Sequence, residues 1–287
     1  MKNVFFTSLI LLFVSSVVAQ DGDFHLDKEY KMNKTGTIDL SSSDAKVFIT
    51  GSNRNSVHVK IDRAVTTKGW AWGGEDFRVD VEESDGDLRI RERQRGSTIG
   101  VVGYYRETYK IEIEAPEGVT LTVRGDDGDY YIKNINGSIS LSLDDADAEL
   151  SDCNGSKFRF RLDDGDLRMN KGKGSIDIDA DDADVEIYQG QFSAITAEFD
   201  DGDLIIETSL TDNGEYYFNS QDGLISLSIT GGGGQFDIRH DEAHVMTMGD
   251  FKTSHDSENH TVVSLASGSA KVTVRADDAR VKLSSNK

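Results

Sequence analysis

Aspartate recurs through the middle of the chain in a four-residue pattern that could hold a metal ion. The pattern is Asp-Asp-Gly/Ala-Asp, and five copies occur at residues 126–129, 144–147, 163–166, 181–184 and 200–203. Carboxylate oxygens are the ligands that Ca²⁺ prefers, because it is a hard cation that tolerates varied geometry. The second and fourth residues of each copy are therefore candidate calcium ligands: Asp127, Asp129, Asp145, Asp147, Asp164, Asp166, Asp182, Asp184, Asp201 and Asp203.

The same aspartates have an explanation that needs no metal. Asp favours turns, because its side chain hydrogen-bonds the nearby backbone and tolerates turn dihedral angles. Ala146 and Ala183 stand where other copies have Gly, which indicates that the third position does not require a positive φ. A solvated turn and a calcium site both remain open on the sequence alone.

Aromatic residues gather in two glycine-flanked segments that interrupt the repeat, residues 68–74 and 96–105. Exposed aromatic rings stack on sugars and anchor protein partners, because a large apolar surface is combined with a polar edge. The sequence thus predicts a binding site at Trp70, Trp72, Tyr104 and Tyr105. The alternative is that both segments fold over one end of a repeat stack as a cap.

These residues support catalysis less well than they support binding. A glycosidase needs two carboxyl groups at a defined separation and with different pKa values. The aspartates repeat uniformly, so the pattern singles out no such pair. We therefore expect a non-enzymatic protein that binds carbohydrate or an envelope or surface protein, or that is structural. The alternative is a polysaccharide-active enzyme on a β-helix scaffold.

The spacing of the repeat indicates which elements must position these residues. The second Asp of each copy lies at 127, 145, 164, 182 and 201, so successive copies are 18 or 19 residues apart. Apolar and polar residues alternate before and after each copy, which is typical of half-buried β-strands. Two short strands cannot bury a core alone, so the units must stack. The sequence predicts an all-β, single-domain parallel β-solenoid with coils of about 18–19 residues; a two-sheet antiparallel β meander is the alternative.

Charged residues support an in-register stack. With a shift of one unit, Arg159 and Arg161 fall on Asp177 and Asp179. Opposite charges next to each other on neighbouring strands are favourable, whereas like charges are not. Arg168 falls between Glu149 and Glu186 in the same way.

The first residues and the overall charge indicate an exported protein. Residues 1–19 contain one Lys, an apolar run and small residues before a plausible cleavage site, as in a secretory signal peptide. We divide the remainder into residues 20–120, an N-terminal β region with the first coils and the two aromatic loops, and residues 121–287, the Asp-turn repeats. The formal net charge of −21 makes nucleic acid an unfavourable partner. We expect no membrane insertion after signal removal and a periplasmic, outer-surface or secreted location.

The chain also resembles a known family. The residues from Tyr109 to Val123, followed by Asp127-Gly128-Asp129 and by residues 135–139, are similar to the bacterial "putative adhesin" family of DUF4097-type β-strand-repeat proteins. The similarity covers most of residues 35–287. This resemblance implies a β-helix-like fold and an envelope or extracellular setting, and it offers no catalytic residues to carry over. The chain differs from the usual pattern in its abundance of Asp at the turns.

Overall fold

The computed structural model describes residues 23–72, 75–96, 100–241, 244–266 and 268–285. All regular elements within these ranges are β-strands, and the expected all-β class is confirmed. The described part of the chain contains no helix long and apolar enough to span a membrane. The proposed signal peptide, residues 1–19, lies outside the described residues.

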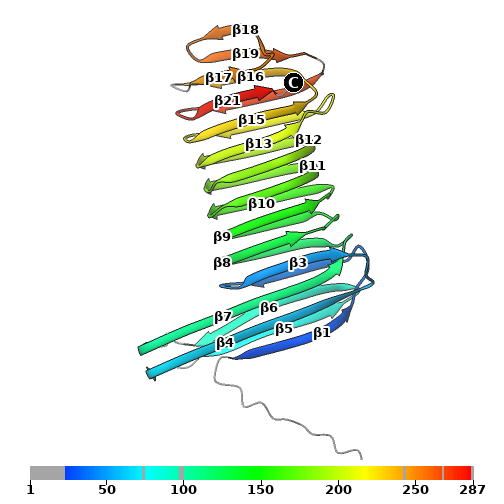
Figure 1. Ribbon diagram of the computed structural model, residues 1–287, viewed down its shortest axis with the longest axis vertical. Helices are drawn as coiled ribbons and strands as arrows, with labels where there is room; N and C mark the ends of the chain where they lie inside the picture. The colour runs from blue at the N-terminus through cyan, green and yellow to red at the C-terminus, as the bar shows by residue number, and fades with distance from the viewer. Residues whose placement is uncertain (1–22, 73–74, 97–99, 242–243, 267, 286–287) are drawn as a thin grey trace, which may run out of the picture.

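The strands stack into a long solenoid with two faces that share one core (Figure 1). Face A contains, in spatial order, β5 (Glu75–Ser84), β6 (Asp87–Gly96), β2 (Thr37–Ser42), the first halves of β8 (Thr120–Lys133) and β9 (Ile139–Cys153), β10 (Lys157–Asp164), the second halves of β11 (Leu167–Asp182) and β12 (Val185–Asp201), β14 (Glu215–Ser220), β20 (Ala270–Ala276), β16 (Gly234–His240), β19 (His260–Leu265) and β18 (Lys252–Ser257).

Face B contains the strands that follow each Asp turn. Its order is β1 (Phe24–Lys31), β4 (Ser56–Trp72), β7 (Gly100–Pro116), β3 (Lys46–Ser52), the second halves of β8 and β9, the first halves of β11 and β12, β13 (Asp203–Ser209), β15 (Leu224–Gly231), β21 (Arg280–Ser285) and β17 (Val245–Met248). Pairing between successive coils is parallel, so the predicted parallel β-solenoid is confirmed.

The core lies between the faces and is built by every second residue of each strand. One inward column shows the principle: Leu141, Phe160, Ile178, Ala197 and Phe218 are directly stacked and all buried. Full burial of one large apolar side chain contributes about 1.5–3 kcal/mol, so the repeated inward positions supply most of the stability. Alternation along each strand leaves the other residues at the surface.

The predicted charge pairs occur on the outer surface. The Arg159 Nε to Asp177 Oδ2 distance is 3.5 Å, and the Arg161 Nε to Asp179 Oδ2 distance is 3.8 Å. Arg168 Nε lies 3.4 Å from Glu186 Oε2. These pairs are exposed and individually weak, so they confirm the register and contribute little to stability.

The Asp turns are of two alternating kinds. Gly165 has a φ of 101°, and a Cβ atom there would lie 2.6 Å from the carbonyl oxygen of Ala146 in the coil below. A Cβ atom on Gly202, which has a φ of 109°, would likewise lie 2.4 Å from the carbonyl oxygen of Ala183. The expectation that the third position needs no positive φ is therefore wrong for the Gly copies. Each Gly copy lies on an Ala copy because the space above the Ala carbonyl accepts no side chain.

Both ends of the solenoid depart from sequential stacking. The coil of β2 and β3 lies between β6 and β7 on one side and β8 on the other. At the opposite end, the C-terminal coil of β20 and β21 lies between β14 and β15 on one side and β16 and β17 on the other. Antiparallel pairs, expected of the alternative meander, occur only in these end regions of the described chain.

Candidate functional site

The two aromatic segments pair with each other. β4 and β7 pair antiparallel over most of their length, from His58 opposite Glu114 to Trp72 opposite Gly100. The paired ends extend beyond the neighbouring strands at the lower left of Figure 1. We call residues 66–72 and 100–106 the ribbon. The sequence predicted two separate loops here, whereas the structure has one two-stranded element, because residues far apart in the chain supply its two strands.

One side of the ribbon carries the exposed aromatic surface. Trp70 lies opposite Val102 and Lys68 lies opposite Tyr104, so all four share a side. Trp70 is 83% exposed and Tyr104 is 48% exposed. Trp72 is described only by its backbone, which lies opposite Gly100 in the same register. The structure thus brings Trp70 and Tyr104 together on this aromatic side.

Tyr105 lies on the other side of the ribbon. Its hydroxyl donates to Glu107 Oε2 at 2.7 Å. Because neighbouring residues of a strand point in opposite directions, Tyr104 and Tyr105 cannot contact one ligand surface together. The predicted set of four aromatic residues is therefore divided between the two sides.

Two glycines face each other within the ribbon, where its two strands come close together. Gly69 lies directly opposite Gly103, with φ angles of 117° and 146°. A Cβ on Gly103 would lie 2.1 Å from the Lys68 carbonyl oxygen, so the two strands approach too closely there for any side chain.

An ion pair between the buried Arg63 and the partly buried Glu107 lies where the ribbon joins the solenoid, a region that we call the root of the ribbon. The Arg63 side chain is 2% exposed, and its Nε donates to Glu107 Oε1 at 2.6 Å. The guanidinium also lies over the Phe77 ring, 4.0 Å from its centroid. A buried charge needs such compensation. Sequence analysis missed this pair, although the signal was present: Arg63 replaces an apolar residue in the inward series of Val57, Ile61 and their alternate neighbours.

Tyr109, on β7, packs at the root of the ribbon against the same Phe77 ring as Arg63. Its ring makes an edge contact with Phe77 at a centroid distance of 5.2 Å. Its hydroxyl is buried and makes no hydrogen bond of regular geometry within the described structure. Burial, and then the nearby Glu92 carboxylate, raise the pKa of Tyr109 far above its usual value, so the hydroxyl stays neutral.

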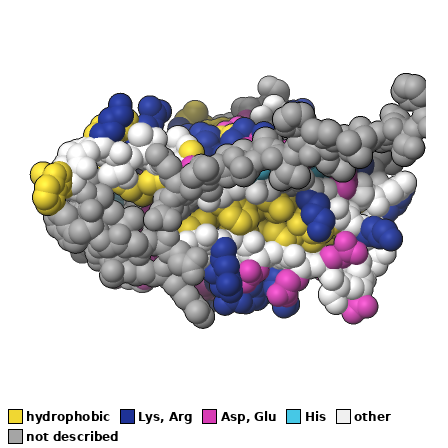
Figure 2. Space-filling model, turned by 90° about the horizontal axis from the view of Figure 1, so that it is seen from below, with side chains coloured by type: hydrophobic (Ala, Val, Ile, Leu, Met, Phe, Trp, Pro, Cys, Tyr) yellow, Lys and Arg dark blue, Asp and Glu magenta, His cyan; other side chains and the backbone are white. Residues whose placement is uncertain are grey.

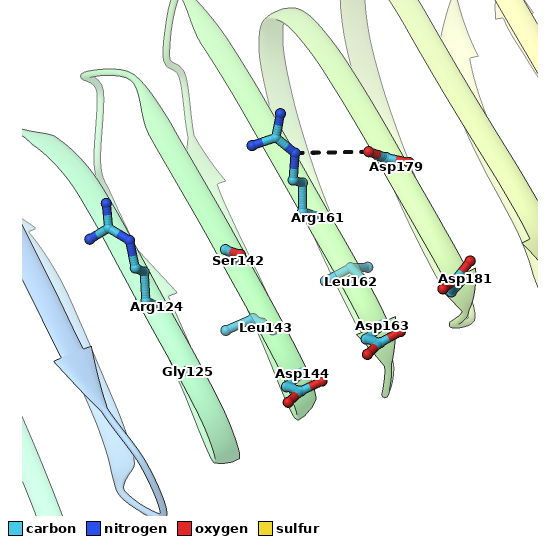
Figure 3. Close-up of a pocket in the computed structure, with 10 residues that line it drawn as sticks. All are labelled: Arg124, Gly125, Ser142, Leu143, Asp144, Arg161, Leu162, Asp163, Asp179 and Asp181. Carbon is cyan, nitrogen blue, oxygen red and sulfur yellow. Dashed lines mark ion pairs between the residues drawn. The ribbon is translucent and has the colours of Figure 1, made fainter.

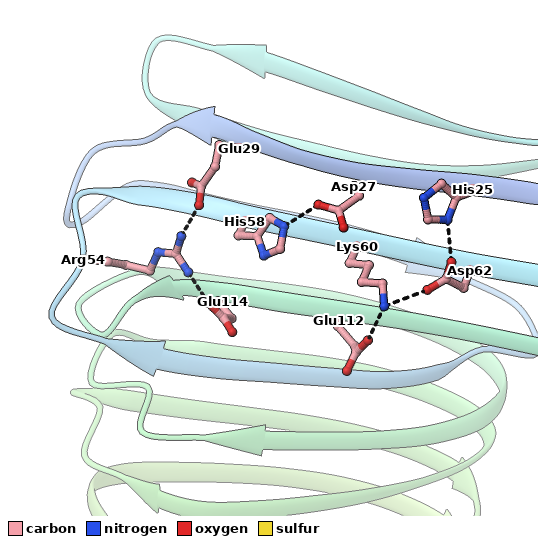
Figure 4. A network of polar contacts seen from close by, with 9 residues as sticks. All are labelled: His25, Asp27, Glu29, Arg54, His58, Lys60, Asp62, Glu112 and Glu114. Atoms are coloured by element: carbon pink, nitrogen blue, oxygen red, sulfur yellow. Dashed lines mark hydrogen bonds and ion pairs between the residues drawn. The ribbon is translucent and has the colours of Figure 1, made fainter. Parts of the chain in front are cut away.

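An exposed polar network joins β1, β4 and β7 on the outer side of face B (Figure 4). His58 Nε2 lies 2.8 Å from Asp27 Oδ1, and the hydrogen bond from His58 lowers the pKa of Asp27. Lys60 Nζ lies 3.2 Å from Asp62 Oδ2. The remaining pairs are His25 with Asp62, Lys60 with Glu112, and Arg54 with both Glu29 and Glu114. Ion pairs among three strands and Arg54, which lies in the loop between β3 and β4, thus hold the base of the ribbon to the solenoid.

The Asp turns stack in register as predicted. Asp145, Asp164, Asp182 and Asp201 are direct neighbours from coil to coil, and Asp127 and Asp129 lie below Asp145 and Asp147. Burial, and then neighbouring carboxylates, raise the pKa values of Asp164, Asp166 and Asp201.

Two turn carboxylates have backbone partners in the next coil. Asp147 Oδ1 accepts from the Asp166 N–H at 2.9 Å, and Asp184 Oδ1 accepts from the Asp203 N–H at 2.8 Å. No group of three or more His, Cys, Asp or Glu side chains among the described residues is arranged to hold a metal ion. The calcium hypothesis stays a prediction, which a comparison of melting temperatures in chelator and in millimolar calcium tests; identical midpoints would contradict it.

Comparison with known proteins places the chain in a family. The family model described as Toastrack DUF4097 matches residues 35–284. Solved structures that the comparison matches to this chain include a "putative adhesin" from Bacteroides fragilis (13% identity, 91% of this chain and 97% of that chain, TM-score 0.45) and one from Parabacteroides distasonis (10%, 92% and 97%, 0.43). A "putative lipid binding protein" from Parabacteroides distasonis is 12% identical over 92% of this chain and 97% of that chain, with a TM-score of 0.41. No curated protein matches. The family match over most of the chain confirms the resemblance, and this protein belongs to the Toastrack DUF4097 family.

Proposed function

We propose that the protein is an exported, non-enzymatic, adhesin-like binding module of the bacterial envelope, and that it takes carbohydrate on the aromatic side of the ribbon. The observation that carries this proposal is that Trp70 and Tyr104 lie on the same exposed side of an element that extends beyond the solenoid. Export rests on the signal-like residues 1–19.

The exposure of Trp70 supports a partner at this position. An indole ring that is 83% exposed gains no burial energy from the fold, so folding alone does not explain it. Aromatic faces bind the apolar C–H faces of sugar rings, and the Lys68 ammonium adds donors for hydroxyl groups. The two-stranded ribbon presents these groups from a base that is fixed by the Arg63 pair and the outer polar network.

The composition of the aromatic side argues against glycan cleavage there. Its described side chains at residues 64–70 and 102–108 are Ala64, Thr66, Lys68, Trp70, Val102, Tyr104, Arg106 and Thr108. None of these carries a carboxylate, so this side offers no acid and base pair of the kind that glycosidases use.

The test replaces Trp70 and Trp72 by Ala, singly and together, and measures binding on a glycan array. Tyr188→Ala is the matched control, because Tyr188 is an exposed aromatic on face B outside the ribbon. We expect a loss of binding of at least about tenfold in the double variant, with an unchanged melting temperature.

Two outcomes contradict the proposal. A lower melting temperature with unchanged binding means that the ribbon is a structural cap. Release of product from the bound glycans in a parallel turnover assay means that the protein is a polysaccharide-active enzyme.

A further inference from the structure

Arginine and serine alternate along one outer column of face A. In the order of the strands, the column consists of Arg91 on β6, Ser41 on β2, Arg124 on β8, Ser142 on β9 and Arg161 on β10, and each residue is directly paired with the next. We call these five residues the Arg column. Successive arginines are separated by two strand spacings, which is about 10 Å.

The strands that carry the Arg column form a basic surface on an acidic protein. Before their turns, the described outward side chains of β6, β2, β8, β9 and β10 include seven cations and two acids. The cations are Arg89, Arg91, Arg93, Arg124, Lys157, Arg159 and Arg161, and the acids are Asp39 and Asp87. Asp80, Asp177 and Asp179 on the adjoining strands pair with Arg93, Arg159 and Arg161. These five strands nevertheless carry a local excess of positive charge in a chain whose net charge is −21.

Asp39 holds several of these arginines in place. Its carboxylate lies 2.7 Å from Arg124 Nη1, 3.5 Å from Arg89 Nε and 3.6 Å from Arg91 Nη2. The side chains of Arg91 and Arg124 nevertheless remain 44% and 56% exposed. One carboxylate therefore orders three guanidinium groups without neutralising them, which lowers the entropy cost of binding an anion.

Shallow depressions lie between the arginines. Three of them share Arg124, and one is lined by Arg124, Ser142 and Arg161 (Figure 3). In this view the two arginine side chains stand on either side of the short Ser142 side chain. The serines thus leave room for a ligand between guanidinium groups that can each bind one carboxylate or sulfate group in a bidentate manner.

We propose that the Arg column binds a linear acidic polysaccharide that lies along the solenoid axis and carries one anionic group for every two sugars. The spacing of about 10 Å between arginines is comparable to the length of an extended disaccharide. Asp144, Asp163 and Asp181 line the other edge of the same depression, and Asp179, which also lines it, lies 3.8 Å from Arg161 Nε. Their charges repel a polymer that is anionic on every sugar, so the site favours the sparser charge pattern.

This site is distinct from the ribbon. The Arg column lies on the outer side of face A, whereas the aromatic side of the ribbon continues the outer side of face B. The failure of one proposal therefore leaves the other unaffected.

The test measures the binding of hyaluronan oligosaccharides, which carry one carboxylate per disaccharide, by calorimetry at about 20 mM and about 150 mM salt. Polygalacturonate is the densely charged comparison, and cellohexaose is the neutral one. The variant is R91Q/R124Q/R161Q, and R168Q is the matched control on face B. We expect hyaluronan binding that weakens with salt, is at least about tenfold weaker in the triple variant, and is unchanged in R168Q and in Trp70→Ala.

Three results would overturn the proposal. The first is the absence of hyaluronan binding at low salt. The second is equal weakening in R168Q, because that outcome reflects general charge and not this column. The third is tighter binding of polygalacturonate or of phosphatidylglycerol vesicles than of hyaluronan, because the surface would then recognise dense anionic charge or a lipid headgroup. Circular dichroism of the triple variant checks that the fold is retained.

Discussion

The coil stack and the N-terminal antiparallel sheet use opposite rules for placing charge. In the stack, parallel in-register pairing places equivalent residues of successive coils on one another, so Asp145 lies next to Asp164 and Asp164 next to Asp182. In the antiparallel sheet, unlike residues meet, as in His25 opposite Asp62 and Asp27 opposite Lys60. A parallel repeat therefore accumulates like charges unless its sequence changes from coil to coil.

The two regions therefore also differ in the interactions that stabilise them. The stack tolerates its acidic turns because the inward columns are apolar and continuous. The sheet at the root of the ribbon has a charged residue, Arg63, at an inward position, and so depends on a specific partner. We therefore expect substitutions to act through lost packing in the stack and through lost pairing at the root.

The largest expected effect comes from the packing of the stack. Phe158 is fully buried and meets Phe192 at a centroid distance of 6.2 Å. Phe158→Ala should lower the free energy of unfolding by about 3–5 kcal/mol, because it leaves a cavity. Trp70→Ala should lower it by less than about 0.5 kcal/mol. Urea unfolding of both variants checks this contrast, and a comparable loss in Trp70→Ala would show that the ribbon belongs to the core.

The next largest effect concerns the root of the ribbon. Arg63→Leu leaves the partly buried Glu107 without its cation, and should cost about 2–4 kcal/mol. Arg168→Leu removes an exposed ion pair and should cost less than about 1 kcal/mol. Equal losses in the two variants would show that the Arg63–Glu107 pair stabilises the protein no more than an exposed ion pair does. The double variant Arg63→Leu/Glu107→Leu should recover part of the loss, because no uncompensated charge remains.

A smaller effect distinguishes the two kinds of Asp turn. Gly165→Ala requires a side chain at a φ of 101° and against the Ala146 carbonyl oxygen, so we expect a loss of about 2–3 kcal/mol. Ala146→Gly creates no such clash and should cost about 1 kcal/mol. Thermal melts of the two variants measure the difference. Gly231→Ala is a further reference, because a Cβ atom there would meet only the Ser209 Cβ, at 3.7 Å. Similar losses at 165 and 146 would mean that the two kinds of turn are equivalent.

The stack could be predicted from the sequence because the determinants of its register are local and repeated. A shift of 18 or 19 residues predicted that Arg159 meets Asp177, and the parallel pairing confirms it. The ribbon could not be predicted in this way, since residues 66–72 and 100–106 carry no shared repeat and are joined through the β5–β6 hairpin. The four predicted aromatic residues all lie in the ribbon, but alternation along β7 separates Tyr104 from Tyr105, and their role in binding stays a prediction.

One feature was visible in the sequence and went unrecognised: Arg63 breaks an inward apolar series, which is a signal for a buried ion pair.

The Arg column, in contrast, could not be predicted without the order of the strands, because β6 and β2 lie next to β8 and not in chain order. Spacing alone cannot place Ser41 between Arg91 and Arg124.

The smallest expected effect is the response to pH, which should have opposite signs in the two regions. Burial, and then the nearby Asp127 carboxylate, raise the pKa of Asp44 in its turn to about 6. The folded state therefore binds a proton more readily than the unfolded state, and this group stabilises the fold as the pH falls through about 6. The hydrogen bond from His58 lowers the pKa of Asp27 at the base of the ribbon. Its contribution is present above the unfolded value of 3.8 and is lost as the pH falls through the lower folded pKa.

Between pH 7 and pH 5 only the first of these two carboxyl groups titrates. The free energy of unfolding should thus rise toward pH 5 by no more than about 1 kcal/mol from Asp44, since solvent screens this side chain. Asp44→Asn should remove that rise, whereas Asp27→Asn should leave it intact and alter only the loss below about pH 4. Urea titrations at intervals of one pH unit measure both slopes. A rise that survives in Asp44→Asn would place its origin in the other stacked carboxylates, where burial and neighbouring charges raise the pKa values of Asp164 and Asp201 in the same direction.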